Sequence, residues 1–160
     1  MSRLSDLSLK DQIFVRSYRW RRIDPVPWAP LQKPLSESRL GIVSSAGLSV
    51  PGQEKFNPKH KGGDPTFREI PSTVEVQDLV ENHRSQSWNH RAVGQDKNLA
   101  IPIDRAKELV EVGRIGSLSD RHLSVMGSIT APGRFLRDHV PQAVDVFVQE
   151  RVDIALLVPV

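Results

Sequence analysis

The side chains with the clearest chemical capability lie between residues 122 and 133. His122 is a candidate for proton transfer, because an unperturbed imidazole titrates near neutral pH, although taken alone it is better explained as a core histidine. The segment Gly127-Ser-Ile-Thr-Ala-Pro-Gly133 is a turn rich in glycine and hydroxyl groups. Its backbone N–H groups, with Ser128 and Thr130, could hold an anion such as a carboxylate or phosphate. A tight entry into a helix would explain the same residues equally well.

A second group of small residues follows an apolar segment earlier in the chain. Apolar residues predict a strand over residues 39–45, which runs into Ser44-Ser-Ala-Gly47. Small residues at the end of a strand let backbone N–H groups approach a ligand, although no glycine-rich phosphate motif is present. We therefore predict a ligand site close to His122 and Val160, at the carboxyl edge of the sheet, that contains Ser44, Ser45, Gly47, Gly127, Ser128 and Thr130.

This site depends on a strand predicted by the run Val152-Asp-Ile-Ala-Leu-Leu-Val-Pro-Val160. An apolar run of that length after a helix is typical of a central parallel strand, buried on both faces. We expect residues 39–45 and 153–160 to be parallel neighbours or near neighbours in one sheet. The predicted fold class is α/β, with an open, mainly parallel sheet, helices on its faces, and an incomplete C-terminus. In such sheets, ligands bind outside the carboxyl ends of the strands.

Three helices are predicted around the sheet. Asp104 is expected to be the N-cap of a helix over residues 105–112. Pro141 should divide a later pattern into helices over residues 132–139 and 141–151, because proline interrupts helical hydrogen bonding. The last helix carries an apolar stripe that is expected to pack against the sheet, formed by Val144, Phe147 and Val148.

The chain is expected to consist of an extended N-terminal arm, residues 1–35, and an α/β domain, residues 36–160, that is the N-terminal portion of a longer domain. Four prolines from Pro25 to Pro34 disfavour a regular helix in the arm. Basic and aromatic residues interleaved near them could stack on bases or bind an acidic partner: Tyr18, Arg19, Trp20, Arg21, Arg22 and Trp28. The favoured interpretation is an arm pinned to its own domain by two tryptophans, with the arginines solvated or paired.

Composition argues against several classes of protein. The net charge is +3, from 22 Lys and Arg against 19 Asp and Glu, a small excess that disfavours nucleic acid as a partner. No apolar run could cross a membrane and no signal-peptide core is present, so we expect a cytoplasmic protein with no membrane partner. The chain has no cysteine, which excludes thiol catalysis within these residues. His83, His90 and Asp96 match no metal-binding spacing, and we predict no metal site.

Four segments spread over nearly the whole chain carry a resemblance to a known family: Tyr18-Arg-Trp-Arg-Arg-Ile-Asp-Pro-Val-Pro-Trp28, Gly63-Asp-Pro-Thr-Phe-Arg-Glu-Ile-Pro71, Gly113-Arg-Ile-Gly-Ser-Leu118 and His122-Leu-Ser-Val-Met-Gly-Ser-Ile-Thr130. They resemble the selenoprotein B family, the substrate-specific subunits of glycine, sarcosine, betaine and D-proline reductases, and their short relatives. The part from Gly113 to Val160 is the most specific.

The resemblance implies an oxidoreductase acting on amino acids or their N-methyl derivatives. In that family the apolar strand leads into a redox motif, selenocysteine or cysteine followed closely by another cysteine, and the selenol is thought to cleave the substrate's carbon–nitrogen bond reductively. This chain ends at Val160, where the motif would follow. We therefore expect a truncated chain, with selenocysteine beyond Val160 encoded by an in-frame UGA codon read as a stop. His122 is then the one catalytic candidate within the chain.

The implied partners are the other subunits of a reductase complex and a small amine or amino-acid substrate. No cofactor can be identified from the 160 residues. The alternative function is a non-catalytic α/β subunit that binds a small anionic ligand, at the turn over residues 127–133, or a partner protein. A third hypothesis is a nucleic-acid-binding module that uses the arginines of residues 19–22.

Overall fold

The computed structural model describes residues 4–18, 22–85 and 89–160, and the chain divides into two units, Met1–Pro30 and Leu31–Val160. The first unit contains a 3-10 turn (Leu4–Asp6) and α1 (Leu9–Ser17). The helices of the second unit are α2 (His90–Gln95), α3 (Ile103–Glu111) and α4 (Val140–Gln149), and it also contains 3-10 turns (Leu35–Glu37, Val76–Asp78, Lys97–Leu99) and a π-helical turn (Phe135–His139). Its strands are β1 (Arg39–Ser44), β2 (Leu48–Ser49), β3 (Phe67–Pro71), β4 (Val80–Glu81), β5 (Ser117–Leu118), β6 (Arg121–Val125) and β7 (Ile154–Val158). None of the helices described is long and apolar enough to cross a membrane.

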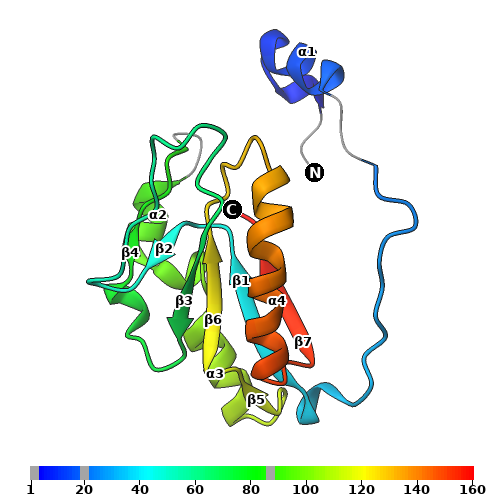
Figure 1. Cartoon of the computed structure of the whole chain (residues 1–160), viewed down its shortest axis with the longest axis vertical. Coiled ribbons are helices and arrows are strands. Elements are labelled where there is room, and N and C mark those ends of the chain that lie inside the picture. The colour runs from blue at the N-terminus through cyan, green and yellow to red at the C-terminus, as the bar shows by residue number, and fades with distance from the viewer. Residues whose placement is uncertain (1–3, 19–21, 86–88) are drawn as a thin grey trace. The chain divides into compact units, whose positions relative to one another are not determined.

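A mixed, mostly parallel five-stranded sheet lies at the centre of the second unit (Figure 1). β7 pairs in parallel with β1 over five residues of each strand, and β5 and then β6 pair in parallel with the other edge of β1. β3 completes the sheet antiparallel to β6, while β2 and β4 form a separate two-stranded ribbon. The predicted α/β class is confirmed, and so is the prediction that residues 39–45 and 153–160 contain parallel neighbours.

β7 lies at an edge of the sheet, and the prediction of a central strand buried on both faces is wrong. Among the residues described, β7 pairs with β1 alone. Leu156 and Leu157, which point to opposite faces, are 41% and 68% exposed. An apolar run indicates that both faces of a strand tend to be covered, but it carries no information on strand order. The order depends on where the preceding crossover places the strand.

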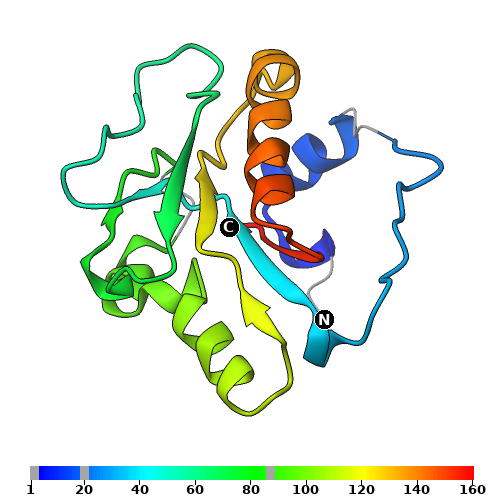
Figure 2. The same ribbon diagram turned by 60° about the horizontal axis from the view of Figure 1, so that its bottom comes forward.

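Helices α3 and α4 lie on opposite faces of the sheet (Figure 2). Residues of α3 line one cavity with Leu40, Ile154 and Leu156, while residues of α4 line another with Val43 and Leu157. Because side chains alternate between faces along a strand, these two sets belong to opposite sides. The main core lies on the α3 side and is formed by Leu40, Ile42, Ala46, Leu48, Ile70, Val76, Leu79, Val93, Ala100, Ile101, Ile103 and Ala106.

On the other face, α4 approaches β1 at a glycine. A Cβ atom on Gly41 would lie 2.8 Å from the ring of Phe147, so only glycine at this position lets the ring lie directly on the strand. The predicted apolar stripe is only partly correct, because Val144 and Val148 are 52% and 68% exposed. Val144 and Leu157 instead line a cavity of about 270 Å³ between α4 and β7.

A boundary between two helices was predicted at Pro141, and the structure changes from a π-helical turn to α4 beside it, between His139 and Val140. The π-helical turn runs directly into α4, and Pro141 lies in the first turn of α4. The N–H of Val140 donates to the carbonyl oxygen of Phe135, five residues back, and Pro141 has no N–H to continue the α-helical pattern, so the hydrogen bonding changes at this place.

The start of α3 also differs from the prediction. The helix begins at Ile103, and Asp104 lies in its first turn, so Asp104 is not the N-cap. Asn98 provides the missing acceptor, because its side-chain oxygen accepts the backbone N–H of Asp104 at 3.1 Å. In return, the side-chain amide of Asn98 donates to the Asp104 carboxylate at 2.9 Å.

The N-terminal arm contains helix α1 ahead of its proline-rich part. The hydroxyl of Ser8 accepts the backbone N–H of Asp11 and so provides the N-cap of α1. Residues 22–34 contain no helix or strand. The predicted base-stacking or pinning residues Arg19, Trp20 and Arg21 lie outside the described residues, and the boundary at residues 35 and 36 stays a prediction.

Candidate functional site

Three parallel strands end at one edge of the sheet, and the segments that follow them meet there. β1 ends at Ser44, β6 at Val125 and β7 at Val158. Beyond the strands, Ala46 and Met126 form an isolated antiparallel bridge, which holds the two following loops together. This is the edge at which open α/β sheets bind ligands.

Ser45 joins the end of β1 to the residues after β7. Its N–H donates to the carbonyl oxygen of Val158 at 3.1 Å, and its hydroxyl oxygen accepts the N–H of Val160 at 2.9 Å. Of the predicted ligand residues, Ser45 is thus the one in direct contact with Val160. The expected proximity of the segment after β1 to Val160 is present in the structure.

Gly127 lies directly against Ser45. A Cβ atom on Gly127 would be 2.6 Å from the carbonyl oxygen of Ser45 and 3.1 Å from Nε2 of His83. Glycine is required at this position because a larger residue would collide with the backbone of the neighbouring loop. The same contact brings a histidine, His83, to this edge of the sheet.

His83 was not predicted as a member of this site. Its side chain is 9% exposed, and Nδ1 accepts the backbone N–H of Ser85 at 3.3 Å. Burial lowers the pKa of His83 below that of a free imidazole. His83 and Val160 line the same cavity, which has a volume of about 470 Å³. Sequence reasoning offered no signal for this placement, since His83 follows β4, an element outside the main sheet.

His122 lies in the core on β6. The backbone N–H of Ile42 donates to its Nδ1 at 3.2 Å, and its Nε2 is 2.9 Å from the hydroxyl oxygen of Ser72. That hydroxyl donates to the carbonyl oxygen of Ser119, so the network assigns the proton of the imidazole to Nε2. Burial, with a smaller effect of Lys107, lowers the pKa of His122 to about 4. The geometry is that of a structural histidine, and its predicted proton transfer stays a prediction.

Ser44 and Gly47 have structural contacts at the end of β1. The hydroxyl of Ser44 is buried, donates to the carbonyl oxygen of Ala100 at 2.6 Å and accepts the N–H of Ala46 at 3.1 Å. Gly47 has a φ of +64° and donates its N–H to the carbonyl oxygen of Val125 at 2.9 Å. Both residues shape the loop after β1, and their role in ligand binding stays a prediction.

Ser128 and Thr130 connect the turn after β6 to other loops. The guanidinium of Arg84 donates to the hydroxyl and carbonyl oxygens of Ser128 at 3.0 and 2.8 Å. The N–H groups of Thr130 and Ala131 both donate to the carbonyl oxygen of Gly62, at 2.8 and 3.1 Å. Two of the N–H groups that were expected to hold an anion are therefore already used within the fold.

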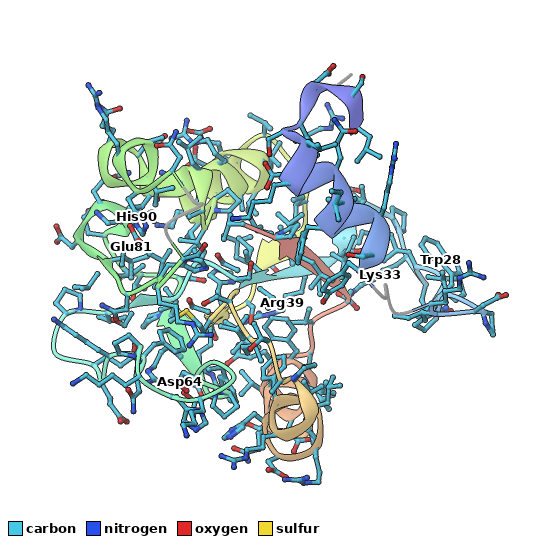
Figure 3. All side chains as sticks on the ribbon, turned by 90° about the horizontal axis from the view of Figure 1, so that it is seen from above. Trp28, Lys33, Arg39, Asp64, Glu81 and His90 are labelled. Atoms are coloured by element: carbon cyan, nitrogen blue, oxygen red, sulfur yellow. The ribbon has the colours of Figure 1, made fainter. Side chains whose placement is uncertain are left out.

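His90 does not lie with His83 in a metal-binding arrangement. Its Nδ1 is 2.7 Å from a carboxylate oxygen of Glu81, which adjoins it in Figure 3, and its Nε2 is 2.8 Å from the carbonyl oxygen of Ser85. The described part of the chain contains no group of three or more histidine, aspartate or glutamate side chains that could hold a metal ion.

Comparison with known proteins gives one informative similarity. No protein-family model and no solved structure matches the chain. It is 29% identical to D-proline reductase subunit gamma of Acetoanaerobium sticklandii over 159 residues, which cover 96% of this chain. The chain is a distant homologue of that reductase subunit. The similarity therefore includes both the arm and the α/β domain of this chain. The chain spans only 61% of the relative's length.

Proposed function

We propose that this chain is a subunit of an amino-acid reductase complex, of the substrate-specific selenoprotein B type. The observation that carries the proposal is the similarity to D-proline reductase subunit gamma, because it extends over 96% of the chain rather than over one motif. The proposed reaction is the reductive cleavage of a carbon–nitrogen bond in an amino acid or an N-methyl derivative. The other subunits of such a complex are the proposed partners.

The reacting group in this proposal follows Val160. β7 leads the chain to the carboxyl edge of the sheet, where Ser45 binds the backbone of Val160. The 160 residues contain no cysteine, so none of them can supply the redox nucleophile. We propose that the gene continues through an in-frame UGA codon into a selenocysteine or cysteine motif. A selenolate or thiolate in that position would be the nucleophile.

His83 is the residue proposed to stabilise this nucleophile by hydrogen bonding. It lines a cavity with Val160, and its lowered pKa favours the neutral ring at pH 7. Because Nδ1 accepts the N–H of Ser85, the neutral ring carries its proton on Nε2, and this N–H can donate a hydrogen bond to a neighbouring thiolate or selenolate. His122 is less suited to this role, because its side chain is fully buried in the core.

The genomic DNA beyond codon 160 provides the simplest test. We expect a UGA codon followed by an open frame that encodes at least one cysteine. A UAA or UAG codon, or a UGA with no such frame, would contradict the proposed truncation.

Activity tests the proposal directly. The chain extended through the stop, with cysteine in place of the expected selenocysteine, should reduce at least one of glycine, sarcosine, betaine and D-proline when a dithiol donor and the companion subunits are present. The 160-residue chain and an extended chain with serine at the same position serve as controls and should be inactive. Inactivity of the extended cysteine form on all four substrates would count against the reductase assignment.

A further inference from the structure

A basic cavity lies between two loops of the α/β domain, and its lining includes Ala131 and Gly133 of the predicted ligand turn. Its walls are formed by residues 60–65 and 131–137, and its volume is about 310 Å³. Four of the residues that line it have basic side chains: His60, Lys61, Arg134 and Arg137.

The charge in this cavity is only partly compensated. Arg137 forms a two-pronged ion pair with Asp138, at 2.6 and 2.8 Å. Neither Lys61 nor Arg134 forms an ion pair with any residue that the structure describes. These two side chains therefore leave an excess of positive charge in a concave site. An excess of this kind favours an anionic ligand.

The walls of the cavity are fixed to one another by backbone contacts. The carbonyl oxygen of Gly62 accepts two N–H groups from the opposite wall, and Gly62 and Gly63 have φ values of +85° and +94°. A Cβ atom on Gly63 would lie 2.7 Å from Cα of Ile129, so the two loops can approach this closely only with glycine there. A site held in this way needs little ordering when a ligand binds.

We propose that this cavity binds a small organic carboxylate, with Lys61 and Arg134 as the charged contacts. The carbon atoms of Pro65 and Ala131 supply apolar wall beside the cations, which suits an organic acid better than a bare inorganic ion. The sequence predicted that backbone N–H groups of the turn over residues 127–133 bind an anion, but two of these groups already donate to the carbonyl oxygen of Gly62. We therefore assign anion binding to the side chains of Lys61 and Arg134.

Saturation-transfer NMR on the 160-residue chain tests this site, because the method detects weak ligands at low protein concentration. Acetate and D-proline are the organic probes, and inorganic phosphate is followed by its ³¹P signal. Both carboxylates should bind saturably, and Lys61→Gln or Arg134→Gln should each weaken binding about tenfold by removing a charge-assisted contact. Arg134→Lys keeps the charge and should keep most of the affinity.

Lys59→Gln is the matched control. Lys59 is exposed, lies two residues from Lys61 and does not line the cavity. Its loss changes the net charge equally but should alter affinity by less than about twofold, because solvent screens exposed charges. Far-UV circular dichroism of every variant should match that of the parent, since Lys61 and Arg134 are also exposed.

Equal weakening by Lys59→Gln and Lys61→Gln would overturn the proposal, because it would show attraction to the positive surface alone. Absence of saturable binding of both carboxylates would overturn it too, and binding of phosphate alone would show that the assigned ligand class is wrong. The proposal does not rest on the reductase function, which the DNA beyond codon 160 tests separately.

Discussion

At the scale of single residues, the histidines show how burial decides which chemistry is open to a side chain. His122 is 0% exposed and both of its ring nitrogens are hydrogen-bonded, so the core uses it as a neutral polar residue. His83 is also buried, but it lies at the carboxyl edge of the sheet and lines a cavity with Val160. Position, more than residue type, separates the structural histidine from the candidate for catalysis.

His122 should make stability depend on pH. Its folded pKa, about 4, lies below the unfolded value of 6.5, so between these values the unfolded chain binds a proton that the folded chain does not. Stability is therefore full above the unfolded pKa and falls as the pH drops toward 4, by up to about 3 kcal/mol. Urea unfolding at about pH 5 and about pH 7 measures the difference.

His122→Gln should remove most of this dependence, whereas His139→Gln, which changes a histidine of the π-helical turn, should not. Equal stability of the parent chain at the two pH values would contradict the assignment of a neutral, buried His122.

Gly127 should tolerate no side chain. In Gly127→Ala, the new Cβ would meet the carbonyl oxygen of Ser45, a backbone atom that cannot move aside easily. We expect a loss of about 1–3 kcal/mol, as for overpacking in a core, measured by thermal or urea unfolding. Gly133→Ala is the control, because a Cβ there has no neighbour within 4 Å. Equal stability of the two variants would contradict the close approach at Gly127.

At the scale of elements, the end of α4 is fastened to the sheet by one carboxylate, at the edge opposite the candidate site. Glu150, whose side chain is 10% exposed, accepts from Nε of Arg121 at 2.7 Å, Nη2 of Arg39 at 3.3 Å and the N–H of Asp120 at 3.1 Å. The hydrogen bond from Arg121 is the largest cause of the lowered pKa of Glu150. Arg39, labelled in Figure 3, also donates its N–H to Asp153, which holds the start of β7.

Glu150→Gln should therefore loosen α4 from the sheet. The amide keeps the shape but loses the charge that two guanidinium groups bind, and we expect a cost of about 2 kcal/mol in the free energy of unfolding. Asp145→Asn, an exposed change of the same charge on the same helix, should cost less than about 0.5 kcal/mol. Similar losses in the two variants would indicate a general charge effect and would contradict the proposed role of Glu150.

At the scale of the whole α/β unit, apolar surface extends around β7. Cavities of about 290 and 270 Å³ lie between β7 and the helices on its two faces, α3 and α4. The partly or largely exposed apolar side chains beside them are Leu109, Val144, Val148, Leu156 and Leu157. Each Å² of such surface left in water costs about 25 cal/mol. Contiguous apolar surface of this kind marks a partner site or promotes aggregation.

The 160-residue chain should consequently be poorly soluble and self-associate through β7. Leu157→Lys should reduce self-association, measured by sedimentation velocity, because it places a charge on the 68% exposed edge strand. Val26→Lys is the control, at a 73% exposed residue of the N-terminal arm, and should leave association unchanged. A parent chain that remains monomeric would contradict the prediction. The chain extended past residue 160 should be more soluble than the 160-residue chain.

The sequence by itself determined the class of fold and the main parallel pair. The apolar residues of 39–45 and 153–160, with a helical pattern before the second, were enough to predict that β1 and β7 are parallel neighbours or near neighbours. Apolar content and periodicity are local properties, and they report element type and the tendency to be buried. The resemblance to a reductase family also came from local segments, and the similarity to a reductase subunit agrees with it at that coarser level.

Only the tertiary structure decided the strand order and the surroundings of each functional candidate. It placed β7 at the edge, buried His122 in the core, and brought His83 to Gly127 and Val160. These outcomes depend on contacts between residues far apart in the chain, such as the bond between Ser45 and Val160 across 115 positions. Local propensity carries no information about such partners, because they are chosen by the packing of the whole sheet and its helices.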